Sequence, residues 1–175
     1  MNSYLEKLGS IKALVFDVDG VFTDGTVTLL PDGDQVRIMN IKDGYAIQHA
    51  VKKGIQIAII SGGKSEAVRK RFSGLGVHHV YLGASYKMDV LKEFMITYDL
   101  VLEDILYMGD DIPDMEIMQQ VGLAIAPNDA APEIKKIAHY VSPIQGGKGC
   151  VRDIVEQYLK LQNKWMGNQK DDFTW

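Results

Sequence analysis

The sequence lacks the features that mark secreted and membrane-spanning proteins. It contains one cysteine among 175 residues. Cys150 therefore has no partner for an internal disulfide, and we interpret it as a small packed residue in a reducing compartment. Residues 1–10 include Glu6 and Lys7 and have no apolar core segment, unlike a signal peptide. No apolar run approaches membrane-spanning length. We therefore expect a cytoplasmic protein with no membrane partner.

An excess of positive charge is also missing. The formal net charge is −4, the pI is near 5.5, and no basic stripe with interleaved aromatic residues is present. Because nucleic-acid binding needs such a stripe, we expect no nucleic-acid partner. The length of 175 residues and the hydrophobic content of 46% suit one domain with a sizeable core. We expect that domain at residues 1–163 and a C-terminal tail at residues 164–175.

Apolar runs alternate with amphipathic segments along the chain. The runs predict buried strands at residues 11–16, 54–60, 79–82, 105–108 and 122–126. The segments between and after them predict helices at residues 44–53, 65–75, 86–98, 115–121, 132–138 and 151–161. This alternation is typical of an α/β fold with three layers, a Rossmann-like parallel sheet covered by helices on both faces.

One segment breaks the alternation. Residues 26–40 read as a β-hairpin, because two short apolar runs flank the turn sequence Pro31-Asp-Gly33. The stretch from Gly25 to Ser61 has room for this hairpin and one helix but not for an inserted domain. We expect the hairpin to project beside the carboxyl end of the sheet.

The first predicted strand ends on two carboxylates, Asp17 and Asp19, followed by Gly20. Side chains two positions apart in a strand share a face, so the two carboxylates begin close together and repel each other. A divalent cation between them, or a proton on one of them, makes such a pair tolerable. Both states suit a site that handles phosphate. The alternative is an ordinary acidic turn after an edge strand.

Polar residues also follow the other predicted strands. Ser61 ends the second strand, and Asp110 and Asp111 follow the fourth. In a parallel α/β sheet the carboxyl ends of the strands meet at one edge, and ligands bind there. The sequence therefore predicts that these residues converge with Asp17 and Asp19 in one site. No cluster of histidine and cysteine indicates a zinc site.

Four motifs stand in a fixed order along the chain: Asp17-Val-Asp19-Gly20-Val, Ser61 after an apolar strand, Lys87 at a helix start, and Gly109-Asp110-Asp111-Ile-Pro-Asp114. They resemble the motifs of the haloacid dehalogenase superfamily of phosphotransferases. Residues 11–159 more closely resemble its capless branch, the 3-deoxy-D-manno-octulosonate 8-phosphate (KDO 8-phosphate) phosphatases. The segments that carry this closer resemblance include Thr23-Asp24-Gly25, Asp43-Gly44 and Gly146-Gly147-Lys148-Gly149-Cys-Val-Arg152.

The resemblance implies a Mg²⁺-dependent phosphatase for a sugar-acid phosphate, with the hairpin in place of a cap domain. Asp17 would be the nucleophile that forms an aspartyl phosphate, and Asp19 the acid that protonates the leaving oxygen and then activates water. Mg²⁺ would be held by Asp17, Asp110 and the main-chain carbonyl of Asp19. Asp111 and Asp114 would orient waters on the metal or cap the following helix.

The other implied roles concern the substrate. Ser61 and Lys87 would neutralise the charge on the phosphoryl group. The glycines after Ser61 expose backbone N–H groups at a helix start, where anions bind. Thr23, Gly62, Gly63, Lys148 and Arg152 complete the expected substrate contacts, Lys148 and Arg152 by attracting a carboxylate. The alternative for the last two is a loop and a surface arginine at a helix start.

Assembly and substrate remain open at this point. The resembled branch forms homotetramers in which the hairpin and the C-terminal segment complete a neighbouring site, and this chain has both parts. Many members carry arginine where this chain has Gly63. The substrate is therefore either the eight-carbon acid phosphate or a nine-carbon relative of the deaminoneuraminate 9-phosphate or N-acylneuraminate type. A phosphoacceptor signalling domain and an idle structural subunit are the alternatives from other classes.

Overall fold

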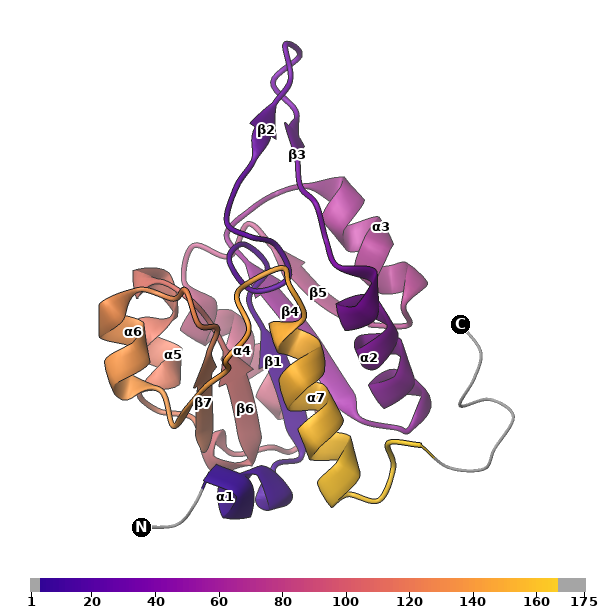
Figure 1. Ribbon diagram of the computed structural model, residues 1–175, viewed down its shortest axis with the longest axis vertical. Coiled ribbons are helices and arrows are strands. Elements are labelled where there is room, and N and C mark those ends of the chain that lie inside the picture. The colour runs from indigo at the N-terminus through magenta and orange to yellow at the C-terminus, as the bar shows by residue number, and fades with distance from the viewer. Residues whose placement is uncertain (1–3, 167–175) are drawn as a thin grey trace.

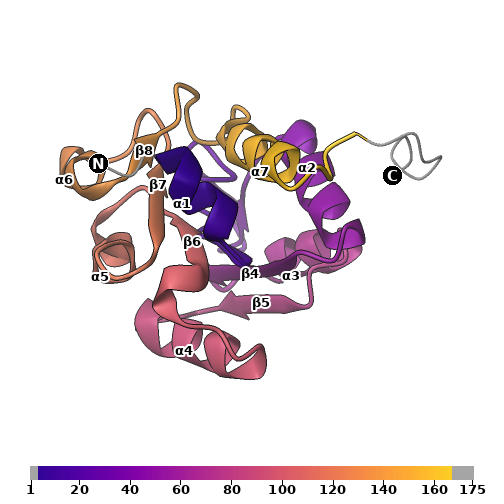
Figure 2. The same cartoon turned by 90° about the horizontal axis from the view of Figure 1, so that it is seen from below.

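A computed structural model describes residues 4–166 and shows one parallel sheet between two layers of helices (Figures 1 and 2). The sheet has the strand order β5-β4-β1-β6-β7-β8. Its strands are β1 (Ala13–Phe16), β4 (Gln56–Ser61), β5 (His79–Leu82), β6 (Ile105–Met108), β7 (Leu123–Ala126) and β8 (Tyr140–Val141). Every neighbouring pair is parallel. The predicted Rossmann-like α/β fold is confirmed.

The helices divide between the two faces of the sheet. One face packs against α1 (Tyr4–Ser10), α2 (Ile41–Lys52), α3 (Glu66–Gly74) and α7 (Cys150–Leu161). The other face packs against α4 (Lys87–Thr97), α5 (Met115–Met118) and α6 (Pro132–Ile137). Two single turns, η1 (Leu102–Asp104) and η2 (Ile112–Asp114), precede β6 and α5. Among the described residues, no helix is long and apolar enough to cross a membrane.

Two apolar clusters, one on each face of the sheet, hold the layers together. Successive strand residues alternate between them: Leu14 and Phe16 lie in one cluster, and Ala13 and Val15 in the other. All four of these β1 residues are completely buried. Because a strand covered on both faces has no polar side to expose, the run around β1 reads as continuously apolar rather than alternating.

The structure moves some of the predicted boundaries. The helix expected from residue 44 starts at Ile41, because the Asn40 side chain accepts a hydrogen bond from the Lys42 N–H and caps it. The helix expected at 115–121 is shorter, with η2 before it. Helix α1 has no counterpart among the predictions. It is one of the shortest helices, and it shows one buried residue, Leu8.

The predicted hairpin is present and stands out from the body of the protein. Its strands are β2 (Thr28–Leu29) and β3 (Gln35–Val36), which pair antiparallel. Figure 1 shows it extending beyond the carboxyl end of the sheet, at the top of the view. Leu29 and Ile38 are 71% and 81% exposed. The hairpin therefore presents apolar side chains that residues 4–166 leave exposed.

The position of β1 decides where a site can form. It pairs with β4 on one side and with β6 on the other, and the chain reaches these neighbours by crossing in opposite directions from β1. Such a reversal of strand order opens a crevice at the carboxyl ends of the strands, where α/β proteins bind ligands. The residues after β1, β4 and β6 therefore face one another.

The end of the chain packs back onto α2. Helix α7 contacts α2 along its length, and Trp165, in the described part of the predicted tail, is buried against Tyr45 and His49. Residues 167–175 of the predicted tail lie outside the described residues, and the domain boundary at residue 163 stays a prediction. The tail thus begins as part of the fold.

Asp43 connects α2 to the start of α7. Its carboxylate accepts a hydrogen bond from the Arg152 backbone N–H at 2.7 Å and another from the Gly149 N–H, so it caps α7 from a different helix. Asp43 is completely buried, and Oδ2 has no hydrogen-bond partner among the described residues. Burial raises its pKa to about 6 from the usual 3.8, despite the two N–H donors.

We predict that Asp43→Ala lowers the free energy of unfolding by about 1–2 kcal/mol, because the cap is lost.

Asp43→Asn keeps an acceptor oxygen and removes the buried charge. The raised pKa means that the native protein loses stability from this carboxylate as pH rises from about 4 through about 6. Asp43→Asn should therefore gain stability relative to wild type in urea unfolding as pH rises from about 4 to about 7. An unchanged difference over that range would contradict this account.

Candidate active site

The turn after β1 brings its carboxylates to the edge of the sheet. The Asp17 N–H donates to the Met108 carbonyl, which continues the pairing of β1 with β6 beyond the strand end. The chain then turns through Gly20, whose φ is +79°. A Cβ atom at Gly20 would overlap the Asp110 carboxylate. Glycine is therefore required here, both for the turn and for the approach of the two loops.

The structure brings Asp17, Asp110 and Asp114 together. One carboxylate oxygen from each lies within 4.8 Å of the others. Asp17 and Asp114 are buried, and Asp110 is partly buried. Burial and the charge of Asp114 raise the pKa of Asp17 to about 7, and burial and the charge of Asp17 raise the pKa of Asp110 to about 7. The three carboxylates form a site that favours a bound cation.

Lys87 partly balances this charge. This lysine is the first residue of α4, and it is buried. Its Nζ lies 2.7 Å from Asp114 Oδ1 and 3.0 Å from Asp17 Oδ1. Burial lowers its pKa, but the two carboxylates outweigh burial and raise it overall. Tyr107, completely buried in β6, donates its hydroxyl to the same oxygen of Asp114 at 2.6 Å. Asp114 therefore fixes the lysine from behind the site.

The donor set fits a hard divalent cation. Asp17 Oδ1 forms an ion pair with Lys87. This buried oxygen nevertheless has no hydrogen-bond partner among the described residues. Asp110 supplies a second carboxylate facing it. Carboxylate oxygens from two loops, with room for waters, are the ligands that Mg²⁺ prefers. Asp17 and Asp110 therefore lie together at the carboxyl end of the sheet, and their role as metal ligands stays a prediction.

Asp111 and Asp114, for which the sequence left two roles open, have different environments. Asp114 contacts Lys87 and Tyr107, and its Oδ2 accepts a hydrogen bond from the Asp110 backbone N–H at 3.0 Å. It thus orders the loop that carries Asp110 in addition to beginning α5. The Asp111 side chain is exposed. Its predicted role in orienting metal-bound waters stays a prediction.

The end of β4 forms the opposite wall. Ser61 is buried at the last position of the strand, and its Oγ accepts a hydrogen bond from the Gly63 N–H at 3.1 Å. Gly62 and Gly63 lie between this strand and α3. A Cβ atom at Gly63 would lie 3.4 Å from Ser61 Oγ and 3.6 Å from Asp19 Oδ2. Ser61, Gly63 and Asp19 thus share one side of the site.

Asp19 is held by a residue that the sequence did not single out. Arg37, just after β3, donates from Nε to Asp19 Oδ1 at 2.6 Å and from Nη2 to Oδ2 at 3.1 Å. The only signal in the sequence is one cation between the apolar hairpin residues Val36 and Ile38. The side chain of Asp19 is 39% exposed, whereas Asp17 is 6% exposed as a residue. The two aspartates of the motif therefore have distinct surroundings.

Comparison with known proteins agrees with this geometry. A family model described as haloacid dehalogenase-like hydrolase matches residues 82–151. The 3-deoxy-D-manno-octulosonate 8-phosphate phosphatase KdsC of Yersinia pestis is 36% identical over 163 residues, which are 93% of this chain and 87% of that protein. The crystal structure of the Yersinia pestis phosphatase has a TM-score of 0.90 at 36% identity and covers 93% of this chain and 88% of that one.

A second structure adds ligands to the comparison. The phosphatase from Moraxella catarrhalis, in complex with magnesium ion, phosphate ion and KDO, has a TM-score of 0.89 at 31% identity and covers 93% of this chain and 94% of that one. The chain belongs to the KDO 8-phosphate phosphatase family of haloacid dehalogenase-like hydrolases. The predicted resemblance to this family is confirmed.

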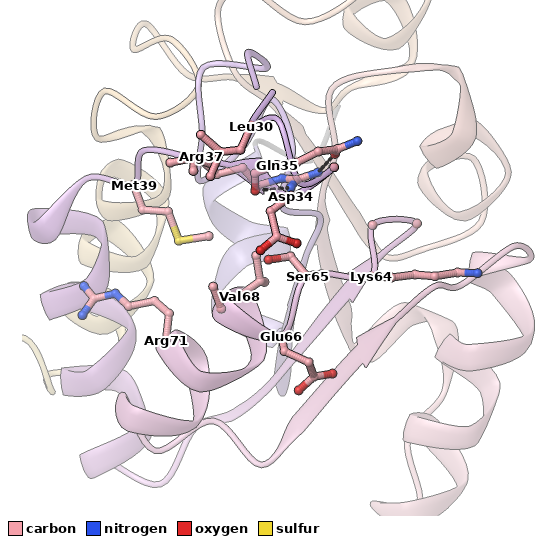
Figure 3. Close-up of a pocket in the computed structure, with 15 residues that line it drawn as sticks. Leu30, Asp34, Gln35, Arg37, Met39, Lys64, Ser65, Glu66, Val68 and Arg71 are labelled. Atoms are coloured by element: carbon pink, nitrogen blue, oxygen red, sulfur yellow. Dashed lines mark hydrogen bonds between the residues drawn. The ribbon is translucent and has the colours of Figure 1, made fainter. Parts of the chain in front are cut away.

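In this member of the KDO 8-phosphate phosphatase family, a cleft opens beside Gly62 and Gly63. It has a volume of about 910 Å³ and lies between the hairpin and the start of α3. Figure 3 shows Arg37 and Gln35 on the hairpin side, with Lys64 extending away from them. Gly62 and Gly63 line this cleft, and Gly63 also lies beside Ser61 and Asp19. A substrate body longer than the phosphoryl group therefore has space next to Arg37.

Thr23, predicted as a substrate contact, has a structural role. Its side chain is completely buried, and its hydroxyl accepts hydrogen bonds from the Gly20 and Gly25 N–H groups, each at 3.2 Å. The pattern Thr-Asp-Gly does not reveal which way the hydroxyl turns, and the predicted substrate contact stays a prediction. Thr23 braces the turn that carries Asp19.

The segment around Gly146–Gly149 contacts the turn that follows β1. The Gly147 N–H donates to the Val21 carbonyl, and Lys148 pairs with Asp24 at 3.6 Å. The loop is thus packed on its own chain rather than free to reach over a site. Arg152 pairs with Glu156 and lies over the rings of Tyr45 and Trp165. Neither cation joins the carboxylate cluster in this structure, and their predicted contact with a substrate carboxylate stays a prediction.

We predict that Lys87→Met destabilises the protein by about 3–5 kcal/mol in the absence of metal, because it leaves buried carboxylates without their cation. Added divalent cation should restore part of this loss, since it supplies positive charge to the same oxygens. Urea unfolding with chelator and with Mg²⁺ measures both effects. Lys92→Met, on the exposed side of α4, is the matched control and should change stability little. Equal losses in the two variants would contradict the proposed charge balance.

Proposed function

We propose that this protein is a Mg²⁺-dependent phosphatase that hydrolyses 3-deoxy-D-manno-octulosonate 8-phosphate to KDO and phosphate, a step that supplies lipopolysaccharide precursors. The observation that carries the proposal is the cluster of Asp17, Asp110 and Asp114 with Lys87 at the carboxyl end of β1. Support comes from the match to KDO 8-phosphate phosphatases over most of both chains. The cytoplasmic location predicted from the sequence remains part of this proposal.

Asp17 is the nucleophile of the proposed reaction. One of its oxygens attacks phosphorus, the bond between phosphorus and the sugar oxygen breaks, and an aspartyl phosphate forms. Water then attacks this phosphorus and releases Asp17 and inorganic phosphate. Asp17 has to be ionised to attack, although burial and Asp114 raise its pKa to about 7. Lys87, 3.0 Å away, favours the ionised form.

Asp19 is the general acid and base. It protonates the departing sugar oxygen in the first step and takes a proton from the attacking water in the second. It is more exposed than Asp17 and lies on the side of the site that opens into the cleft. That is the side where a leaving sugar has room.

Mg²⁺ would be held by Asp17, Asp110 and the main-chain carbonyl of Asp19. When bound, it offsets the negative charge of the carboxylates and of the phosphoryl group. Lys87 adds positive charge where negative charge develops on the transferred phosphoryl group. Ser61 and the N–H groups of Gly62 and Gly63 offer neutral hydrogen-bond donors. Asp114 positions Lys87 for this role.

The nine-carbon acid phosphate is the second candidate substrate. Gly63 keeps this alternative open, because many family members carry arginine there and the sugar would be held differently without it. The signalling alternative is not needed, since a phosphoacceptor domain requires no second aspartate for a leaving group. An idle subunit is not favoured, because Asp17, Asp19, Ser61, Lys87 and Asp110 are all present.

We predict phosphate release from 3-deoxy-D-manno-octulosonate 8-phosphate with Mg²⁺, and none in excess chelator. Asp17→Asn should abolish turnover while the protein stays folded, because the amide is not a nucleophile toward phosphorus. Released phosphate is measured for eight-carbon and nine-carbon sugar-acid phosphates side by side. Full activity with chelator, or normal turnover of Asp17→Asn, would contradict the proposal. A preference for the nine-carbon acid would change the substrate but not the chemistry.

We further propose a homotetramer in which hairpins meet neighbouring subunits. The support is the exposed apolar surface of the hairpin, where Val27, Leu29, Leu30, Val36 and Ile38 are 39–81% exposed. Apolar side chains grouped on a projecting element are typical of an interface. Closed symmetry would bury the same surface in every subunit.

We predict that Leu29→Asp with Ile38→Asp reduces the assembly to monomers in light scattering, because charge is costly in an apolar interface. Turnover of the sugar-acid phosphate should fall more than turnover of a small aryl phosphate, which needs fewer contacts beyond the phosphoryl group. Ile96→Asp is the matched control, since Ile96 is 82% exposed on α4, away from the hairpin. A wild-type protein that is fully active as a monomer would overturn the proposal.

A further inference from the structure

The hairpin places one guanidinium on the carboxylate of Asp19. The two hydrogen bonds from Arg37 reach different oxygens, Nε to Oδ1 at 2.6 Å and Nη2 to Oδ2 at 3.1 Å. This is the side-by-side geometry in which an arginine fork fixes both the position and the plane of a carboxylate. The pair joins residues from the turn after β1 and from the base of the hairpin.

Arg37 is itself held in place. Its side chain is 9% exposed, and Nη2 also donates to the Gln35 side-chain oxygen at 3.2 Å, drawn as a dashed contact in Figure 3. An ion pair between two mobile surface residues contributes little, because both side chains lose rotamer freedom. Here the guanidinium is already ordered by β3. The ion pair can therefore define where the Asp19 carboxylate sits.

The absence of a side chain at residue 63 leaves space for this arrangement. A Cβ atom on Gly63 would lie 3.4 Å from Arg37 Nη2 and 3.6 Å from Asp19 Oδ2. A long side chain there would have to cross the ion pair. The same guanidinium borders the 910 Å³ cleft. Arg37 thus borders both the Asp19 carboxylate and the cleft.

We propose that Arg37 is a positioning residue that acts through Asp19, holding the acid and base carboxylate at the leaving-group side of the site. The proposal rests on the function proposed above. A carboxylate offers about four lone-pair positions, and the fork uses two of them. The remaining positions face away from Arg37 and stay available for the proton that passes to the leaving oxygen or comes from water.

A double-mutant cycle with Asp19 tests this proposal, using assembled protein with Mg²⁺. Arg37→Ala should lower kcat for the sugar-acid phosphate roughly 10- to 100-fold, part of the 10²–10⁴-fold that a general acid contributes, and should change KM less than about threefold. In an Asp19→Asn background the same substitution should cause no further loss, because its target is gone. Arg37→Lys should fall in between, since lysine supplies charge without the fork.

The leaving group gives a second readout. The effect of Arg37→Ala should be smaller with p-nitrophenyl phosphate, whose leaving group needs no protonation, and Asp19→Asn should show the same difference. Lys42→Ala, an exposed cation two residues after Asn40, is the matched control and should keep the wild-type rate. Light scattering and thermal unfolding of each variant confirm assembly and folding. Arg37→Lys supplies the comparison if Arg37→Ala does not assemble.

Three results would overturn the inference. An unchanged kcat in Arg37→Ala means that Asp19 needs no support from the hairpin. An equal loss with and without Asp19 means that Arg37 acts on the substrate directly. A rise in KM without a fall in kcat means a binding role alone. If Asp19→Asn itself keeps the full rate, the proposed mechanism fails instead, so the two failures are distinguishable.

Discussion

The structure depends on negative charge held at low exposure beside β1. Asp17 and Asp114 are buried within reach of Asp110, and among the described residues Lys87 is the cation that contacts the cluster. Such an arrangement is costly unless positive charge is supplied, because burial penalises ionised groups. Lys87 at the start of α4, the Tyr107 hydroxyl and the tight turn at Gly20 all serve to keep these oxygens together. The fold thus keeps together a cluster of carboxylates that favours a bound cation.

The same arrangement gives two identical side chains, those of Asp17 and Asp19, different surroundings. Asp17 lies within the buried cluster, whereas Asp19, two residues later, is turned outward and is paired with Arg37. Environment rather than residue type therefore distinguishes them, as expected where two carboxylates perform different steps. The hairpin contributes to this distinction through Arg37, so in the proposed mechanism it takes part in the chemistry as well as bordering the site.

Much of this was predictable from local sequence. Continuous apolar strands, their spacing and the residues that end them located Asp17, Ser61 and Asp110 at one edge of the sheet, because parallel strands share a direction. Lys87 entered only through the resemblance to the family's motifs. Hydrogen bonds between distant segments left no such signal in the sequence. Packing between distant segments determines three of these contacts: the ion pair of Arg37 with Asp19, the cap that Asp43 provides for α7, and the inward orientation of the Thr23 hydroxyl. Helix α1 escaped prediction because a short helix with one buried leucine has little periodicity.

The order of strands in the sheet has a consequence for how the protein matures. Strand β1 is made first but obtains both of its neighbours only after β4 and β6 exist, and Asp110 follows β6. A nascent chain that ends before β6 carries Asp17 without its facing ligand. The proposed pair of metal ligands can therefore face each other only after the non-local pairing of β1 with β6 has formed.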